Sequence, residues 1–563
     1  MNRPRRAHVY ASVEEFNDTP RRSRRRIIAA STVTALAGLL VLFILLMPIK
    51  YESLKPGSFV RIPAEALLGI GLAVVLPPRP RRVVAILAGI GMGLLLILKF
   101  LDMGFYAVLV RPFDPVLDWT FVRDGMEFLS TSAGRVGAFF TIGAIVVAAV
   151  LMLALTTLSS LRLSNVMVRH NRAATGAVAV LGTTWIACAA MGAQVVPGVP
   201  VASEGAIKLT YKHLQKFRSS LHDEKEFEKA ASIDAFRNTP GDRLLTSLRG
   251  KDVMLTFIES YGRTATENPQ VAATLDDGTR RLKAAGFESR SGFLTSSTAG
   301  GGSWLAHSTT LSGLWINNQR RYHTLVSSNR MTLNKAFQRA GWRSLGIVPG
   351  VTRSWPESHF FGYDKIYTSH DLGYQGPRFG WATMPDQYTL QTYQNLEAGK
   401  PHPPTFTQMI LLSSHAPWAP LPKTVGWDQL GDGSIFNGIA ATADKRRWVW
   451  QSNYRIRSAY MKSVQYSVDS LVSYVEKYGK DNLVLVFLGD HQPVPLVAGQ
   501  GASRDVPITI VAHDKAVLDR IAGWGWQDGI RPNAQAPVWP MSAFRDHFLS
   551  AFSPNSSGPQ AGR

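Results

Sequence analysis

Five apolar stretches, separated by short polar segments, occupy most of the first 200 residues of the chain. They cover residues 27–49, 62–76, 83–98, 136–158 and 173–196. A helix needs about 20 apolar residues to cross the hydrocarbon core of a bilayer, so the pattern predicts an α-helical transmembrane domain of five helices. The second stretch is short and contains Glu65, so a buried or re-entrant helix is the alternative there.

The distribution of arginine predicts how these helices are oriented. Eight arginines precede the first stretch. Others follow the second and fourth stretches: Arg79, Arg81, Arg82, Arg162, Arg169 and Arg172. Because cytoplasmic loops are enriched in Lys and Arg, these segments should be cytoplasmic. Everything after about residue 196 then lies outside the cytoplasm, in a multi-pass protein of the cell (inner or plasma) membrane.

One outward loop, residues 102–135, combines aromatic side chains with scattered charges. Its aromatic residues are Phe105, Tyr106, Phe113, Trp119, Phe121 and Phe128. Such a composition is typical of a segment that lies among lipid headgroups. A plain connector between two helices is the alternative.

The pattern changes from about residue 203 to short apolar runs separated by helical patterns. The runs cover residues 253–258, 344–348, 406–412, 483–488 and 508–511 and predict buried strands. Apolar side chains recur every three or four residues from Ile456 to Val475, which predicts a helix. Strands that alternate with helices predict an α/β domain with a mainly parallel sheet, in which ligands collect at the carboxyl ends of the strands.

Composition and charge narrow the classes of partner. The 563-residue chain has a net charge of +21, of which residues 1–200 contribute about half. Much of this excess is arginine beside membrane segments, so an anionic lipid is the expected partner and nucleic acid is not. The single cysteine, Cys188, excludes an intramolecular disulfide framework and a zinc module built from cysteines.

Two predicted strands end at side chains that bind metal ions. Residues 253–258 run directly into Glu259, and residues 483–488 run through Gly489 into Asp490 and His491. Carboxylates and imidazole are ligands for divalent cations. A capping or solvated Glu259, and ordinary loop hydrogen bonds for the other two, are the alternatives.

A glycine-rich segment, residues 295–313, places Ser303 after three glycines with the pattern of a helix start. A metal ion and the helix dipole would activate a hydroxyl there as a nucleophile. The alternative is a flexible Ser/Gly linker. A further strand, residues 406–412, is followed by His415, which could bind phosphate, move a proton or serve only a structural role.

Together these segments resemble the alkaline phosphatase superfamily, and within it the membrane-anchored sulfatase-like branch of lipoteichoic acid synthases and related phosphoglycerol or phosphoethanolamine transferases. The similar blocks are F-I-E-S-Y-G from Phe257, G-G-S from Gly301, F-G-Y-D-K from Phe361, L-S-S-H-A-P-W from Leu412, G-D-H-Q-P from Gly489 and V-P-I-T-I from Val506. They occur in the family's order and cover nearly the whole outer domain.

The resemblance implies roles for individual residues. It implies metal ligation by Glu259, Asp490 and His491, with Ser303 as both nucleophile and metal ligand. It also implies catalytic and substrate-binding roles for His415. The cofactor would be one divalent ion, Mn, Zn or Mg.

Three departures bear on the substrate. Leu305 and His307 occupy the positions that sulfatases need for conversion to formylglycine, so sulfate ester hydrolysis is not expected. The outer domain has no cysteine, whereas phosphoethanolamine transferases of this type usually carry several disulfides. The loop after the third strand lacks the histidine of lipoteichoic acid synthases, and Arg353 and Trp355 are the candidates for headgroup binding instead.

The resemblance therefore implies transfer of a phosphoryl-linked headgroup, phosphoglycerol first, from an anionic membrane phospholipid to an envelope glycan or lipid acceptor. A phosphodiesterase, phosphatase or sulfatase-like hydrolase, a phosphoethanolamine transferase, and a non-enzymatic scaffold are the alternatives. The expected domains are a basic cytoplasmic N-terminus (1–26), the transmembrane domain (27–200), a linker (201–245) and the extracytoplasmic catalytic domain (246–563).

Overall fold

The computed structural model describes residues 24–115, 117–118 and 120–553. These residues form two compact units, which we describe separately. One comprises the chain up to Pro48, Glu52–Lys99 and Val136–Tyr211. The other comprises Ile49–Tyr51, Phe100–Arg135 and the chain from Lys212 onward.

The first unit is built from apolar helices, as the sequence predicts. The helices are α1 (Arg24–Leu46), α2 (Ala64–Val75), α3 (Pro78–Leu109), α4 (Thr120–Arg169) and α5 (Asn171–Met191). By length and composition, α1, α3, α5 and the Val136–Arg169 part of α4 can each cross a membrane. The 12-residue α2 rises only about 18 Å, which is less than the hydrocarbon thickness. Each of the five apolar stretches contains a helix, but among the described residues only four of these helices can cross a membrane, so the predicted count of five spanning helices is not confirmed.

Charged side chains in this unit satisfy helix ends. The Glu65 carboxylate accepts hydrogen bonds from the backbone N–H groups of Ala206 (3.0 Å) and Ile207 (2.9 Å), at the start of α6 (Gly205–Ser232). Lys99 Nζ donates to the carbonyls of Ile44 (2.7 Å) and Met47 (2.8 Å), near the end of α1. Both charges therefore neutralise backbone groups that a helix leaves unpaired. Four short strands connect the described helices of this unit: β1 (Ile62–Pro63), β2 (Gln194–Val196), β3 (Val199–Pro200) and β4 (Ala202–Ser203).

The second unit is an α/β domain around one mixed sheet. Its strands are β5 (Asp252–Ile258), β6 (Glu288–Thr295), β7 (Arg343–Val348), β8 (Lys365–Thr368), β9 (Thr405–Leu411), β10 (Leu483–Gly489), β11 (Asp505–Ala512), β12 (Gln527–Asp528) and β13 (Val538–Pro540). The order is β12-β6-β11-β10-β5-β9-β7-β8, and β13 also pairs with β6. Strands β10, β5, β9, β7 and β8 are mutually parallel, while β11 is antiparallel to β10 and β6. The predicted mainly parallel sheet is confirmed.

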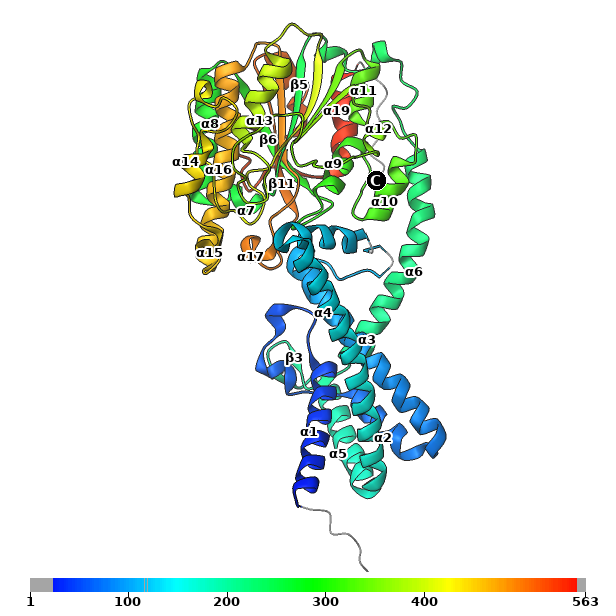
Figure 1. Ribbon diagram of the computed structural model, residues 1–563. Coiled ribbons are helices and arrows are strands. Elements are labelled where there is room, and N and C mark those ends of the chain that lie inside the picture. The colour runs from blue at the N-terminus through cyan, green and yellow to red at the C-terminus, as the bar shows by residue number, and fades with distance from the viewer. Residues whose placement is uncertain (1–23, 116, 119, 554–563) are drawn as a thin grey trace, which may run out of the picture. The chain divides into compact units, whose positions relative to one another are not determined.

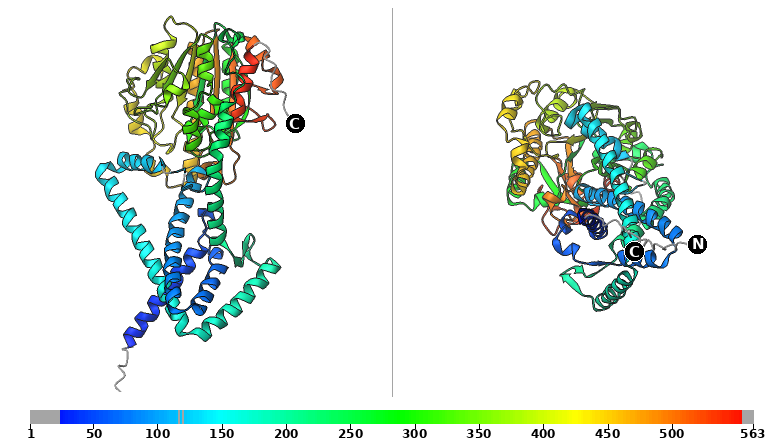
Figure 2. Two further views of the ribbon diagram at one scale, coloured as in Figure 1. Left: turned by 90° about the vertical axis from the view of Figure 1, so that its right-hand side faces the viewer. Right: turned by 60° about the horizontal axis from the view of Figure 1, so that its bottom comes forward.

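Helices cover both faces of this sheet (Figure 1, Figure 2). One face packs against α8 (Pro269–Ala284), α13 (Asp386–Tyr393) and α16 (Asn453–Tyr478). The other packs against α9 (Ser303–Ser312), α11 (Leu333–Arg339) and α19 (Phe544–Phe552). Helix α16 is the predicted amphipathic helix, and its apolar stripe from Ile456 to Val475 is buried. Shorter helices are α7 (Arg263–Thr266), α10 (Gln319–Val326), α12 (Ser358–Phe361), α14 (Phe436–Thr442), α15 (Arg446–Val449), α17 (Pro495–Ala498) and α18 (Lys515–Asp519).

The predicted outward loop, residues 102–135, belongs to the same unit as the sheet but is largely helical, because α3 extends to Leu109 and α4 begins at Thr120. Asp102 is buried and its Oδ2 lies 2.9 Å from His213 Nε2, and the buried Asp118 pairs with Arg111 at 2.6 Å. Its described aromatic rings include Phe105 and Phe113, which pack edge to face at 5.2 Å. Trp119 and the side chains of Phe121 and Phe128 lie outside the described residues. The proposed position of this loop among lipid headgroups stays a prediction.

The last turn of α3 approaches the glycine-rich segment ahead of Ser303. The backbone carbonyl of Val108 lies so close to Gly300 that a Cβ on Gly300 would be 1.7 Å from its oxygen. Leu109 Cδ2 would lie 3.3 Å from a Cβ on Gly301. Glycine therefore permits a backbone-to-backbone approach at this point that no other residue would allow.

Candidate active site

The predicted metal ligands meet at the carboxyl ends of two neighbouring strands. Strands β5 and β10 pair in parallel with Ile258 opposite Gly489. The next residues, Glu259 on one chain and Asp490 and His491 on the other, therefore lie side by side. Each of the three offers a ligand atom within 4.8 Å of the others, and all three are buried. This geometry agrees with the prediction that the metal-ligand side chains after two distant strands lie close together.

The turn after β5 is shaped to hold this group. Ser260 adopts a left-handed conformation (φ +54°), and its N–H donates to Asp490 Oδ1 (2.7 Å) while its hydroxyl donates to Glu259 Oε1 (3.1 Å). Tyr460 on α16 donates to the Ser260 carbonyl (2.8 Å). Gly489 lies so close to this turn that a Cβ there would be 1.8 Å from the carbonyl oxygen of Tyr261. The backbone of both strand ends is thus fixed by neighbouring elements.

Ser303 begins helix α9, and its side chain points at Glu259, Asp490 and His491, which we call the ligand group. Its N-cap, Gly302, has φ +83°, which an L-residue adopts only with strain. Ser303 Oγ donates to Glu259 Oε2 (3.0 Å) and lies 3.2 Å from His491 Nε2. A helix N-terminus also presents free N–H groups to an anion. The predicted helix start is confirmed, and the hydroxyl lies where a nucleophile beside a metal ion would be placed.

The hydrogen bonds of the ligands test whether a cation fits. Asp490 Oδ1 accepts from the N–H groups of Ser260 and His491, whereas Asp490 Oδ2 is buried without a hydrogen-bond partner among the described residues. His491 Nδ1 lies 2.8 Å from the carbonyl of Gln492 and must donate to it, which leaves Nε2 facing the carboxylates as the ligand nitrogen. An orphan carboxylate oxygen and an oriented imidazole suit a divalent ion with oxygen and nitrogen ligands, such as Mn, Zn or Mg.

The electrostatics of the group point the same way. Burial raises the pKa of Glu259, but the charge of His415 and the hydrogen bond and charge of His491 outweigh burial and lower it. Burial and the neighbouring Glu259 carboxylate raise the pKa of Asp490. Burial lowers the pKa of His491, but the carboxylates of Asp490 and Glu259 outweigh burial and raise it to about 9. The two carboxylates of Glu259 and Asp490 share the single positive charge of the His491 imidazolium. A divalent cation would supply the positive charge that the second carboxylate lacks.

His415 follows β9 in the loop beside Glu259. The backbone N–H of Glu259 donates to the carbonyl of Leu411 (3.0 Å), and the Ser414 hydroxyl donates to the carbonyl of Glu259 (2.5 Å). The His415 ring stacks on Trp381, with centroids 4.2 Å apart and planes 20° apart. His415 thus contributes to the electrostatics of the ligand group from an orientation that Trp381 supports.

Two residues that sequence reasoning missed organise this loop. The buried Asp386 accepts hydrogen bonds at Oδ1 from the N–H groups of Leu412 (2.7 Å) and Ser413 (2.9 Å), and at Oδ2 from Ser467 (2.6 Å). Trp381 is 47% exposed although it stacks on His415. Neither residue follows a strand, so the strand-end rule could not identify them.

The structure places Arg353 and Trp355 in the loop after β7. Arg353 is exposed. Trp355 Nε1 donates to the Tyr322 hydroxyl (3.2 Å), and its ring packs near Phe361 (5.6 Å) and Tyr363 (6.1 Å). Trp355 therefore has a packing role, and headgroup binding by this pair stays a prediction.

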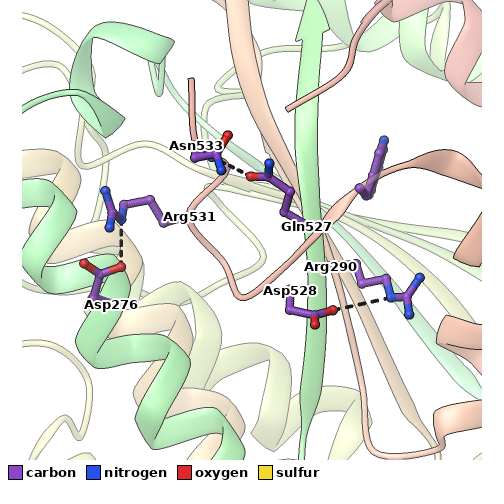
Figure 3. Close-up of a pocket in the computed structure, with 7 residues that line it drawn as sticks. Asp276, Arg290, Gln527, Asp528, Arg531 and Asn533 are labelled. Atoms are coloured by element: carbon purple, nitrogen blue, oxygen red, sulfur yellow. Dashed lines mark hydrogen bonds and ion pairs between the residues drawn. The ribbon is translucent and has the colours of Figure 1, made fainter. Parts of the chain in front are cut away.

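A separate hollow lies at the β12 edge of the sheet (Figure 3). It measures about 600 Å³ and is lined by Asp276, Arg290, Trp526, Gln527, Asp528, Arg531 and Asn533. Its charged side chains pair with one another, Arg531 with Asp276 at 2.7 Å and Arg290 with Asp528 at 3.7 Å. Strands β6, β11 and β10 separate this edge from β5, so the hollow is distinct from the ligand group.

Comparison with known proteins supports the assignment of the domain. Residues 252–505 match the family model described as Sulfatase, a range that includes Glu259, Ser303, His415, Asp490 and His491. Among the curated proteins, none matches this sequence.

The chain is also similar to solved structures. The lipoteichoic acid synthase LtaP from Listeria monocytogenes is 13% identical over 60% of this chain and 79% of its own, with a TM-score of 0.37. The phosphoglycerol transferase GacH from Streptococcus pyogenes is 14% identical over 60% and 81%, with a TM-score of 0.36. The lipooligosaccharide phosphoethanolamine transferase EptA from Neisseria meningitidis is 13% identical over 92% and 95%, with a TM-score of 0.45.

No functional conclusion follows from likenesses at this level of identity and TM-score. The assignment depends instead on the family match and on the membrane helices that precede the matched residues. Residues 252–505 are similar to the Sulfatase family, and helices that are long and apolar enough to cross a membrane precede them in the chain.

Proposed function

We propose that this protein is a metal-dependent transferase that moves a phosphoryl-linked headgroup from a membrane phospholipid to an extracytoplasmic glycan or lipid acceptor through a phospho-Ser303 intermediate. One observation supports the proposal most strongly. Ser303 Oγ lies 3.0 Å from Glu259 and 3.2 Å from His491, at the start of a helix and beside a buried group of three metal-ligand side chains. A nucleophile in that position suits displacement at phosphorus.

In the first half of the reaction, Ser303 Oγ forms a bond to the phosphorus of the donor, and the bond from phosphorus to the diacylglycerol oxygen breaks. A Mn, Zn or Mg ion held by Glu259, Asp490 and His491, with Ser303 Oγ beside it, would lower the pKa of the hydroxyl and offset charge on the phosphoryl oxygens. The hydroxyl proton leaves along the hydrogen bond from Ser303 to Glu259. Diacylglycerol departs after it takes up a proton, for which His415 is the donor.

In the second half, an acceptor hydroxyl replaces Ser303 Oγ on phosphorus. The acceptor oxygen loses its proton to His415, and Ser303 regains its proton from Glu259 along the same hydrogen bond as it leaves phosphorus. The positive end of the α9 helix dipole, at Ser303, favours a phosphoryl oxygen at this position. The product carries the headgroup on the acceptor, and the enzyme returns to its starting state.

The membrane helices support a lipid as the donor, because an enzyme that acts on a soluble ester gains nothing from them. An anchor raises the effective concentration of a membrane substrate at the site. The basic excess of the chain favours an anionic headgroup, and the cysteine-free outer domain favours phosphoglycerol over phosphoethanolamine. The arginine distribution places the reaction outside the cytoplasm. Arg353 and Trp355 are the proposed headgroup-binding residues.

The test is to capture the intermediate. The purified protein in detergent is incubated with phosphatidylglycerol, phosphatidylethanolamine or a soluble chromogenic phosphodiester, and peptides containing Ser303 are analysed by mass spectrometry. We expect diacylglycerol release from phosphatidylglycerol and a glycerophosphate mass added to Ser303. If the soluble ester turns over well while neither lipid releases diacylglycerol, the protein is an anchored phosphodiesterase instead.

The hydrolase alternative is separated by the acceptor. In the same assay, a transferase converts headgroup to a glycan or lipid product when an acceptor is supplied. If headgroup appears only as the free phosphate ester with every acceptor, water is the acceptor and the hydrolase reading is correct.

A further inference from the structure

His307 lies one turn after Ser303 on α9 and faces Asp490 of the ligand group. The proposed mechanism gives His307 no role. Its Nε2 is 4.0 Å from Asp490 Oδ2. Both atoms are buried, and neither has a hydrogen-bond partner in the part of the chain that the structure describes. The residue itself is only 8% exposed. A buried donor and a buried acceptor that face each other without a partner call for an explanation, because each is costly to leave unpaired.

The surroundings restrict how this pair can relax. Asp490 Oδ1 is fixed by the N–H groups of Ser260 and His491, both at 2.7 Å, so the carboxylate cannot rotate without breaking two hydrogen bonds. The His307 ring packs on Phe257, with centroids 4.2 Å apart, and this contact holds its plane. The remaining freedom is a shift of about 1 Å that brings Nε2 to hydrogen-bond distance from Oδ2.

We propose that His307 is a positioning residue of the metal centre, and that its Nε2–H donates to Asp490 Oδ2. One lone pair of Oδ2 would then accept from His307 while the other is directed at the cation. The inference rests on the metal site of the proposed function. It adds a hydrogen bond that orients a metal-binding carboxylate. Removal of such a hydrogen bond typically weakens metal binding by about 10- to 100-fold.

The alternative is a core histidine that serves only to fill space against Phe257. The two readings differ in what the nitrogen does. A space-filling ring can be replaced by an apolar side chain with loss of stability alone, whereas a donor is needed for metal affinity. A glutamine at position 307 separates them, because its amide nitrogen lies near the position of Nε2 and can donate.

The experiment is calorimetric titration of Mn²⁺, and separately of Zn²⁺, into the metal-stripped full-length protein in detergent. The native chain, His307→Gln and His307→Leu are compared, and thermal unfolding of each metal-free variant is measured alongside. The matched control is His547→Leu, since His547 also stacks on an aromatic ring, Trp539 at 4.3 Å, but lies on α19 outside the ligand group.

We expect His307→Leu to weaken metal binding by about 10- to 100-fold, His307→Gln to recover most of that loss, and His547→Leu to bind as the native chain does. Equal affinity of His307→Leu and the native chain would overturn the inference and leave the metal site intact. Equal weakening by His307→Gln and His307→Leu would also overturn it, because a hydrogen-bond donor at position 307 would then make no difference to metal binding. If neither ion binds the native chain, the metal site of the proposed function is itself wrong.

Discussion

Ser303 Oγ and Glu259 Oε2 lie 3.0 Å apart although 44 residues separate them in the chain. Two separate elements produce this contact. Strand β5 ends just before Glu259, and a glycine turn starts α9 at Ser303. The fold therefore holds the Ser303 hydroxyl beside the Glu259 carboxylate before any substrate binds.

Replacing Ser303 with alanine should remove the covalent step. We expect activity to fall by on the order of 10³-fold or more, because no other group replaces an attacking oxygen. Metal content should stay close to native, since Glu259, Asp490 and His491 remain. Activity assays and metal analysis of the purified variant test this, with Ser308→Ala, on the same helix, as the control. Substantial residual activity would transfer the role of nucleophile to another hydroxyl, such as the buried Thr298.

Asp490→Ala and His491→Ala should each lose metal and activity together. Each variant removes one of three ligand side chains, and a divalent ion held by the remaining two is bound far more weakly. Metal stoichiometry after dialysis is the measurement. Native stoichiometry in both variants would show that the ion, if any, is held elsewhere.

Metal binding should depend on pH in a defined direction. In the metal-free protein the pKa of His491 is raised to about 9, so below that pH an ion must displace a proton from His491 before it can bind. Affinity should therefore increase as the pH rises towards about 9. Calorimetry in buffers of different ionisation enthalpy would count the released protons. Affinity that is independent of pH between 6.5 and 9 would contradict this assignment.

The same raised pKa predicts how the metal-free protein responds to pH. His491 is protonated more readily in the folded state than in the unfolded state, whose value is near 6.5. Its stabilising contribution is therefore complete below about pH 6.5 and is lost as the pH rises through 9. Thermal unfolding of metal-stripped protein should show a falling melting temperature across that window, and His491→Gln should remove most of the decline.

Gly300→Ala should disturb the segment around the nucleophile. A Cβ at Gly300 would lie 1.7 Å from the Val108 carbonyl oxygen, in addition to the strain of φ +72°. Gly501 has the same φ and nothing within 4 Å, so Gly501→Ala measures the strain alone, about 1–2 kcal/mol. We expect Gly300→Ala to cost clearly more unfolding free energy and to lower activity. Equal losses in the two variants would show that the contact with Val108 is unimportant.

The orientation can be checked by labelling with an impermeant thiol reagent in intact cells, after Cys188→Ser. A cysteine at Arg81 should be protected, and one at the exposed Lys477 should react. The position near Ser557 would serve the same purpose but lies outside the described residues. The opposite pattern would invert the proposed topology.

Sequence patterns identified the parts of this site that follow apolar strands. Glu259 and Asp490 come directly after runs of buried residues, so their place at the sheet edge could be inferred. Strand β6 was missed because its sequence, E-S-R-S-G-F-L-T, has no apolar run: Gly292 and its polar neighbours accommodate Trp526 and the paired strands β11, β12 and β13 instead.

Side chains that act through a tertiary contact left no sequence signal. Asp386 serves the His415 loop from a helix start, and Trp381 supports the His415 ring from an irregular segment. The role of Glu65 was also hidden, because its partners on α6 lie about 140 residues further along the chain. Only a three-dimensional arrangement brings such pairs together.

The approach of Val108 to Gly300 has a practical meaning for anyone who wishes to study the sulfatase-like domain apart from the membrane. The compact unit that contains Ser303 is assembled from three separated pieces of chain, and one of them, Phe100–Arg135, includes the end of α3 and the start of α4. A soluble fragment that begins near residue 246 would therefore have an uncovered glycine turn directly ahead of Ser303. Ligands selected against such a fragment would be fitted to a surface that the intact protein does not present.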